Sequence, residues 1–230
     1  MKTTFASILL LVSALTSQAT TYTFNPNPID LNDLDHHMAY TWQLSGLSLG
    51  GNITSASLTF TNIYNWDNSA NALFIHLLDT ALATPTHTLI NGAYPTILGT
   101  GVGSEVTAFT DAPTIQAPVT DINDDFAGAR YLANPLVNGS TTLNTLLTSY
   151  SGLTTTPIPA LTYTFTAAQL GILQSYIMNG NNIAFGIDPD CHYFNDKVTF
   201  TYSCPDAGGT AALLGFALLP IAAARRKFCA

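Results

Sequence analysis

Alternating apolar and polar residues predict several β-strands in the middle of the chain. In the clearest case, Ala56, Leu58 and Phe60 alternate with serine and threonine, as expected for a strand with one buried face. In another, Trp42 is the expected buried aromatic side chain. The predicted strands span residues 40–44, 53–64, 73–78, 161–165, 183–187 and 197–202. So many short strands predict a domain that is mainly β.

One helix is also predicted. Thr166 and Gln169 have the spacing of a capping box, in which the two side chains bond each other's backbone N–H groups. An apolar stripe runs from Leu170 to Ile177, and Gly180 provides the stop signal. We therefore expect an all-β (mainly) fold, an antiparallel β-sandwich of jelly-roll-like form with one capped helix packed over a sheet.

The N-terminal residues have the pattern of an export signal. Lys2 precedes a short apolar run, and Ser17, Gln18 and Ala19 supply small residues where a signal peptidase requires them. We expect residues 1–19 to form a signal helix that directs the chain to the Sec export route and is cleaved off after Ala19. A retained N-terminal anchor is the alternative.

The C-terminal residues have the pattern of a membrane span. Residues 207–224 carry no charge, and as a helix they would extend over ~27 Å, close to the ~30 Å of a bilayer's hydrocarbon core. The apolar run stops at Arg225, Arg226 and Lys227, which the positive-inside bias places in the cytoplasm. This pattern predicts a C-terminal transmembrane helix.

A short motif precedes that apolar run. It consists of Cys204, Pro205, Asp206, Ala207 and Gly208. The order of motif, apolar run and basic cluster over residues 204–228 resembles the PEP-CTERM class of bacterial sorting tails, in its VPDSG-type variant. Cysteine stands at the first position, where that variant usually has valine, and alanine at the fourth, where it usually has serine.

The resemblance implies a partner and a destination. In that class an exosortase, a membrane cysteine protease-transpeptidase, recognises the motif and removes or exchanges the tail. The ectodomain then stays at the cell surface, often in a polysaccharide matrix. A permanent anchor is the alternative. We divide the chain into a signal peptide at 1–19, a secreted β-sandwich domain at 20–203 and a sorting and membrane segment at 204–230.

Charge narrows the choice of partners for the exported part. Residues 20–206 contain 14 acidic residues but only two basic ones, Arg130 and Lys197, so their formal net charge is −12. Nucleic acid is excluded as a partner, because binding its phosphates requires a basic patch. The negative charge suits either solubility in an extracellular matrix or the binding of divalent cations.

Two short segments carry possible metal ligands. Asp188, Asp190, Asn195 and Asp196 lie in the connection between two predicted strands, where oxygen ligands can converge on Ca²⁺. An ordinary polar turn, in which these side chains bond their own backbone, is the alternative.

The second segment precedes the strand of Trp42 and contains Asp33 and Asp35, followed by His36 and His37. If the N-terminal and C-terminal strands pair, this segment meets the first one. Together with His192, its histidines make Zn²⁺ chemically possible, but the many oxygens favour Ca²⁺.

Trp66 offers a possible glycan contact, because Tyr64, Asp67 and Asn68 flank it and an exposed aromatic beside amides suits carbohydrate. We nevertheless favour a buried tryptophan at a sheet edge.

A disulfide between Cys191 and Cys204 is not expected. A predicted strand intervenes between them and would hold the two residues too far apart.

The sequence contains no Gly-x-Ser-x-Gly elbow, His-Glu-x-x-His helix or phosphate-binding loop. We therefore predict a non-enzymatic surface or matrix protein whose cation-stabilised sandwich binds polysaccharide. The alternative is a secreted metal-dependent hydrolase that uses the Asp and His segments.

Overall fold

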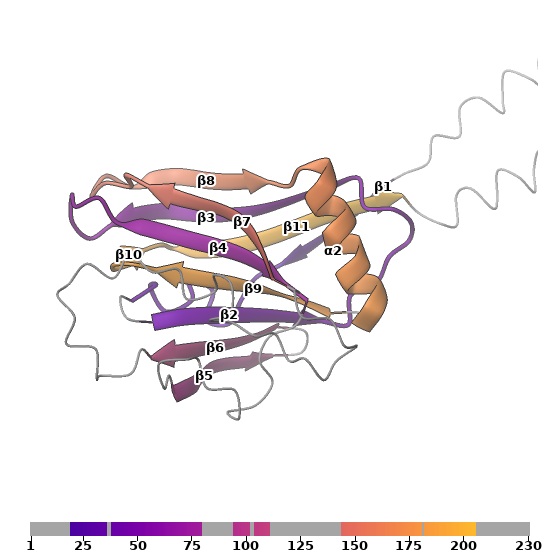
Figure 1. The fold of residues 1–230 in the computed structure, drawn as a ribbon, viewed down its shortest axis with the longest axis horizontal. Helices are drawn as coiled ribbons and strands as arrows, with labels where there is room; N and C mark the ends of the chain where they lie inside the picture. Colours follow the sequence, from indigo (N-terminus) through magenta and orange to yellow (C-terminus); the bar gives the residue numbers. More distant parts are fainter. Residues whose placement is uncertain are drawn as a thin grey trace, which may run out of the picture.

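The fold is an antiparallel β-sandwich with one helix in its described part, as a computed structural model shows (Figure 1). The structure describes residues 19–35, 38–79, 94–101, 104–110, 144–180 and 182–205. The prediction of a mainly β, two-sheet fold with one capped helix is confirmed.

One sheet is built around β3 and contains five strands. They are β1 (Ala19–Phe24), β3 (Ser55–Asn65), β8 (Ile158–Thr164), β10 (Tyr193–Phe194) and β11 (Lys197–Pro205). The order is β1-β11-β3, with β8 on the other edge of β3 and β10 paired to the end of β3, and every pair is antiparallel. The first and last strands of the described chain are therefore neighbours.

The other sheet contains six strands in the order β5-β6-β2-β9-β4-β7, again all antiparallel. They are β2 (Met38–Ser45), β4 (Ala72–Leu78), β5 (Tyr94–Gly101), β6 (Ser104–Thr110), β7 (Asn144–Ser151) and β9 (Asn182–Pro189). The strand predicted at residues 73–78 is β4, which has β9 on one side and β7 on the other.

The core lies between the inner faces of the two sheets. Phe185 of β9 meets Phe200 of β11 edge to face, with 4.9 Å between the ring centroids, and Trp42 of β2 lies 5.5 Å from Phe185. All three side chains are fully buried. The alternating pattern thus identified the inward residues correctly, including Trp42.

Helix α2 (Ala167–Gly180) covers one end of the sandwich. The predicted capping box is present: the Gln169 N–H donates to Thr166 Oγ1 at 3.4 Å, and the Thr166 N–H donates to Gln169 Oε1 at 2.9 Å. The helix buries Leu173 and Ile177 in the core. Its N-terminus is therefore fixed by local bonds and its position by apolar packing.

The two ends of the sandwich differ in what they carry. Ala19 at the start of β1 pairs with Pro205 at the end of β11, and α2 lies at this same end, which we call the tail end (Figure 1). The opposite end, which we call the distal end, carries the loops at 25–35, 66–71 and 190–196. Ala19, after which we expect the signal peptide to be cleaved, thus lies beside Pro205 of the predicted sorting motif at the tail end.

None of the helices in the described ranges is long and apolar enough to cross a membrane. Residues 1–18 of the predicted signal helix lie outside those ranges. The predicted membrane span at 207–224 lies outside them as well.

Candidate functional site

The two predicted ligand segments meet at the distal end. His192 Nδ1 lies 3.0 Å from Asp35 Oδ1, and the Asn195 N–H donates to Asp33 Oδ1 at 3.2 Å. Asn195 Nδ2 also donates to the Asp30 carbonyl at 2.8 Å. The expectation that pairing of the terminal strands would bring these segments together is confirmed.

Local geometry explains how the 25–35 loop reaches this position. Asn25 Nδ2 donates to the Val198 carbonyl at 2.7 Å, so the loop is held against β11 as soon as β1 ends. Leu31, Asn32 and Asp33 then have φ values of 58°, 64° and 48°. Such left-handed backbone is accessible to Asn and Asp but unfavourable for Leu, whose full burial in the core offsets the strain. The result is a tight turn that aims Asp33 at Asn195.

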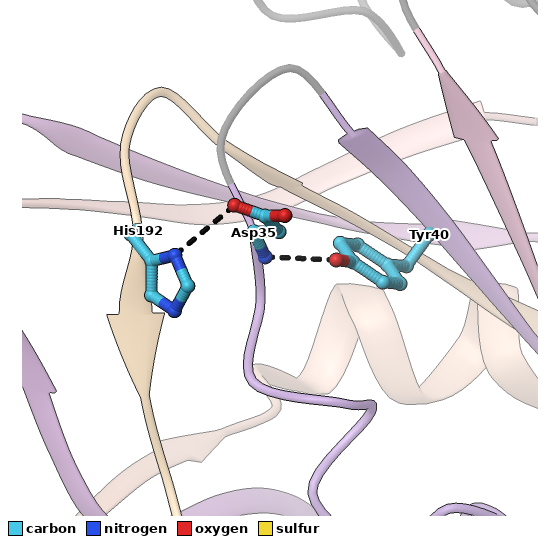
Figure 2. A network of polar contacts seen from close by, with 3 residues as sticks. All are labelled: Asp35, Tyr40 and His192. Atoms are coloured by element: carbon cyan, nitrogen blue, oxygen red, sulfur yellow. Dashed lines mark hydrogen bonds and ion pairs between the residues drawn. The ribbon is translucent and has the colours of Figure 1, made fainter.

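Tyr40 lies beside the loop and supports it (Figure 2). Its hydroxyl oxygen accepts a hydrogen bond from the Asp35 N–H at 2.8 Å. Burial raises the pKa of Tyr40 to about 12, and the carboxylates of Asp35 and Asp33 act in the same direction. The phenol is therefore neutral at ordinary pH and holds the backbone at Asp35, while the carboxylate of that residue faces His192.

The remaining predicted ligands are held by other strands. Asp190 Oδ2 accepts the N–H of Ala72 at the start of β4, at 3.0 Å. Asp196 Oδ2 accepts Asn62 Nδ2 of β3 at 2.6 Å. Asp188 is buried within β9. His36 and His37 lie outside the described residues. The structure thus brings Asp33, Asp35, His192 and Asn195 together, while Asp190 bonds to β4 and Asp196 to β3.

Within the described part of the chain, no group of three or more His, Cys, Asp or Glu side chains is arranged to hold a metal ion. One polar atom at the meeting of the loops is nevertheless unusual: Asn195 Oδ1 is buried and makes no hydrogen bond there. The calcium site stays a prediction.

Trp66 corrects one of our expectations. Its side chain is 58% exposed, so the interpretation of a buried tryptophan at a sheet edge is wrong. The reason is register: Asn65, at the end of β3, points inward and is fully buried, so the next residue along the chain points out.

The backbone of Trp66 is joined to a strand pair that carries further aromatic side chains. In the ladder of β3 and β10, Phe194 is opposite Tyr64 and their rings stack at 5.1 Å. The His192 ring lies 4.5 Å from that of Phe194, and the His192 carbonyl accepts the Trp66 N–H at 3.0 Å. We call Tyr64, Trp66, His192 and Phe194 the aromatic patch. Sequence reasoning missed Phe194, because the two-residue strand β10 carries too short a pattern to be recognised.

The loop beside the patch is fixed by its own side chains. Asp67 Oδ1 accepts the Ser69 N–H at 2.8 Å and Asn71 Nδ2 at 3.0 Å, and Asn65 Oδ1 accepts the same amide at 3.2 Å. These bonds order the backbone on the C-terminal side of Trp66. Binding of a ligand that stacks on Trp66 would therefore cost little conformational entropy, because the loop is already ordered.

The predicted sorting motif begins inside the fold. Cys204 is fully buried and belongs to the core, and Thr20 of β1 is its cross-strand partner. Cys204 is a free thiol, as is Cys191 near the distal end. A small apolar side chain is what this position requires, which explains why cysteine can replace the valine usual in such tails. Asp206 to Gly208 and the basic residues 225–227 lie outside the described ranges.

A shallow groove of about 390 Å³ runs along α2 at the tail end, lined among others by Ile53, Leu170, Gln174 and Met178. It contains none of the residues that the sequence singled out as ligands or contacts, and every lining residue is uncharged.

Comparison with known protein families identifies a VPDSG-CTERM motif at residues 204–228. Comparison with curated proteins and with solved structures found no match. The chain therefore carries a PEP-CTERM-like sorting tail, as the resemblance indicated, and is an exported protein directed to the cell surface. The match covers the tail alone and carries no information about the activity of the sandwich.

Proposed function

We propose that an exosortase processes the sorting tail and that the sandwich, left at the cell surface, binds a neutral polysaccharide through the aromatic patch. The observation that carries the proposal is the 58% exposure of Trp66 in a structure whose other tryptophan is fully buried. Large exposed aromatic side chains that are held rigidly are typical of recognition surfaces.

The chemistry of the patch suits a sugar chain. Aromatic faces pack against the C–H faces of pyranose rings, while hydroxyl groups at the ring edges need polar partners. Asp35, 52% exposed beside His192, and Asn68 beside Trp66 can provide them. The carboxylates of Asp35 and Asp67 would repel uronic acids, so we expect a neutral polysaccharide rather than an acidic one.

The position of the patch supports the same proposal. It lies at the distal end, whereas the sorting tail leaves from Pro205 at the tail end. A domain attached through its C-terminal end, before or after processing, would therefore present the patch away from the membrane and toward the matrix.

A bound cation is the second element of the proposal. The buried Oδ1 of Asn195 and the carboxylate of Asp33 are hard oxygen ligands on the two segments that meet there. Ca²⁺ at this point would join the two loops and stabilise the support of the patch.

The expected affinity contribution of Trp66 follows from its exposed area. A tryptophan offers roughly 250 Å², of which 58% is exposed here, and a sugar ring covers about half of what is exposed. At ~25 cal/mol per Å² the ~70 Å² buried contributes about 2 kcal/mol, so Trp66→Ala should raise the dissociation constant about 20-fold.

Affinity electrophoresis of the exported protein tests this proposal, with gels that contain dextran, galactomannan or alginate. We expect retardation by a neutral polysaccharide, its loss in Trp66→Ala and its retention in Met178→Ala. Met178 is a matched control because it is 70% exposed but lies in α2 at the tail end. Equal retardation of both variants, or retardation by alginate alone, would refute the role of the patch.

A further inference from the structure

The sorting motif does not begin on a free linker but on a paired strand. Cys204 and Pro205, its first two residues, are the last two residues of β11, opposite Thr20 and Ala19 of β1. The Cys204 side chain is fully buried, so a membrane enzyme cannot contact it while β11 is in place.

The other side of this strand end is also occupied. The Thr54 N–H donates to the Ser203 carbonyl at 2.9 Å, just ahead of β3. The chain at Gly51 is so close that an added Cβ would lie 3.3 Å from the Pro205 carbonyl oxygen. The end of β11 is therefore enclosed on both edges, by β1 and by the segment that leads into β3.

Strand β1 is the part of this enclosure that can separate, because it is the edge strand of its sheet. Besides its backbone ladder with β11, side chains hold it: Tyr22 stacks on Tyr202 at 4.8 Å, and Thr21 Oγ1 and Ser203 Oγ share a hydrogen bond of 2.7 Å. Nearer the distal end, the ring of Phe24 lies 6.3 Å from that of Phe200 and 6.0 Å from that of Tyr202. After signal cleavage the exposed face of β1 consists of Thr21 and Thr23, which bury little apolar area. Local opening of such an edge costs less than global unfolding.

We propose that β1 gates the processing of the tail, so that the exosortase engages the motif only after Cys204 and Pro205 have separated from β1. The inference rests on the proposed processing by an exosortase. A processing enzyme binds its substrate as an extended segment with free backbone groups, whereas here those groups belong to the sheet. Cleavage of folded proteins accordingly follows the population of a locally opened state.

The test is a reversible crosslink across the gate, made by Thr20→Cys in the full-length protein. Residues directly opposite on antiparallel strands have Cα atoms ~4.5–5.5 Å apart, within the range that a disulfide requires. With oxidised glutathione, the thiols of residues 20 and 204 lose two protons and two electrons to form the disulfide, and the glutathione disulfide is reduced to two thiols. Peptide mapping without reductant establishes that the link joins these two residues.

Processing is then followed by intact mass in membranes that contain the exosortase. We expect tail removal to fall at least tenfold in oxidised Thr20→Cys and to recover fully in dithiothreitol. Thr20→Ser and the wild type, in the same two buffers, control for any effect of the oxidant on the enzyme. Unchanged processing of the crosslinked protein would overturn the gate.

Two further variants test the gate from opposite directions. A flexible spacer after Pro205, followed by a second copy of residues 204–208, presents the motif outside the sheet. Processing of this chain should be insensitive to the crosslink, and continued inhibition would overturn the proposal. In the other direction, Tyr22→Ala removes the stacking on Tyr202 and should speed processing roughly threefold or more. If the wild type itself keeps its tail, the proposed processing fails, and the gate fails with it.

Discussion

Tyr40 allows the support of the candidate site to be tested through pH. In the folded protein its pKa is about 12, compared with 10.0 for an unperturbed tyrosine. Between pH 10 and pH 12 the unfolded chain therefore binds fewer protons at this residue than the folded protein does, so the free energy of unfolding falls as pH rises. The stabilisation is complete below pH 10 and is lost as pH passes through 12.

The change to make is Tyr40→Phe, which removes both the titrating group and the acceptor for the Asp35 N–H. At pH 8 the loss of that acceptor should lower the free energy of unfolding by ~1–3 kcal/mol. A shift of about two pKa units corresponds to roughly 3 kcal/mol once both states have ionised, of which roughly 1 kcal/mol is lost by pH 11. The deficit of the variant relative to the wild type should therefore shrink by roughly 1 kcal/mol between pH 8 and pH 11.

Urea unfolding of the two proteins at pH 8 and pH 11 measures this difference. Other tyrosines with raised pKa values, such as Tyr193 and Tyr202, are present in both proteins and cancel. Tyr202→Phe is a matched control, because its hydroxyl donates to the Ser48 carbonyl away from the distal loops. It should show the same dependence on pH but leave polysaccharide binding unchanged, whereas Tyr40→Phe should weaken binding. A deficit of equal size at both pH values would refute the assignment of Tyr40.

Two other predictions concern the loops and the motif. In excess Ca²⁺ the exported protein should melt several degrees higher than in chelator, because a hundredfold excess over Kd adds ~2.7 kcal/mol to the free energy of unfolding. Asp33→Ala should abolish this difference. Identical melting curves of the wild type in the two buffers would rule the cation out. Cys204→Val should change the free energy of unfolding by less than ~1.5 kcal/mol, because it keeps a small apolar side chain in the core. The near-isosteric Cys204→Ser should lower it by ~1–3 kcal/mol, because a hydroxyl is then buried. Equal urea midpoints for the two variants would contradict the core position of this residue.

Local patterns in the sequence were sufficient for the elements of the fold. The alternation of Ala56, Leu58 and Phe60 predicted which face of β3 is buried, because side chains on a strand alternate with a period of two whatever the strand pairs with. The capping box of α2 depends on residues three apart, and the sorting tail is a linear motif. Each of these features is specified by neighbours in the chain.

The candidate site was specified by the sequence only in part. The convergence of Asp33 and Asp35 with His192 and Asn195 could be predicted on the condition that the terminal strands pair. The partners of Asp190 and Asp196 could not, because they are a backbone N–H of β4 and an amide of β3, which sequence separation does not reveal.

What only the tertiary structure decided is the exposure and enclosure of particular side chains. Trp66 is exposed because β3 ends one residue earlier with Asn65 pointing inward, and Cys204 is enclosed because β1 pairs with it from the other end of the chain. Both outcomes depend on the register between segments more than a hundred residues apart. Such register is set by the combined packing of two sheets, which no local window of sequence contains.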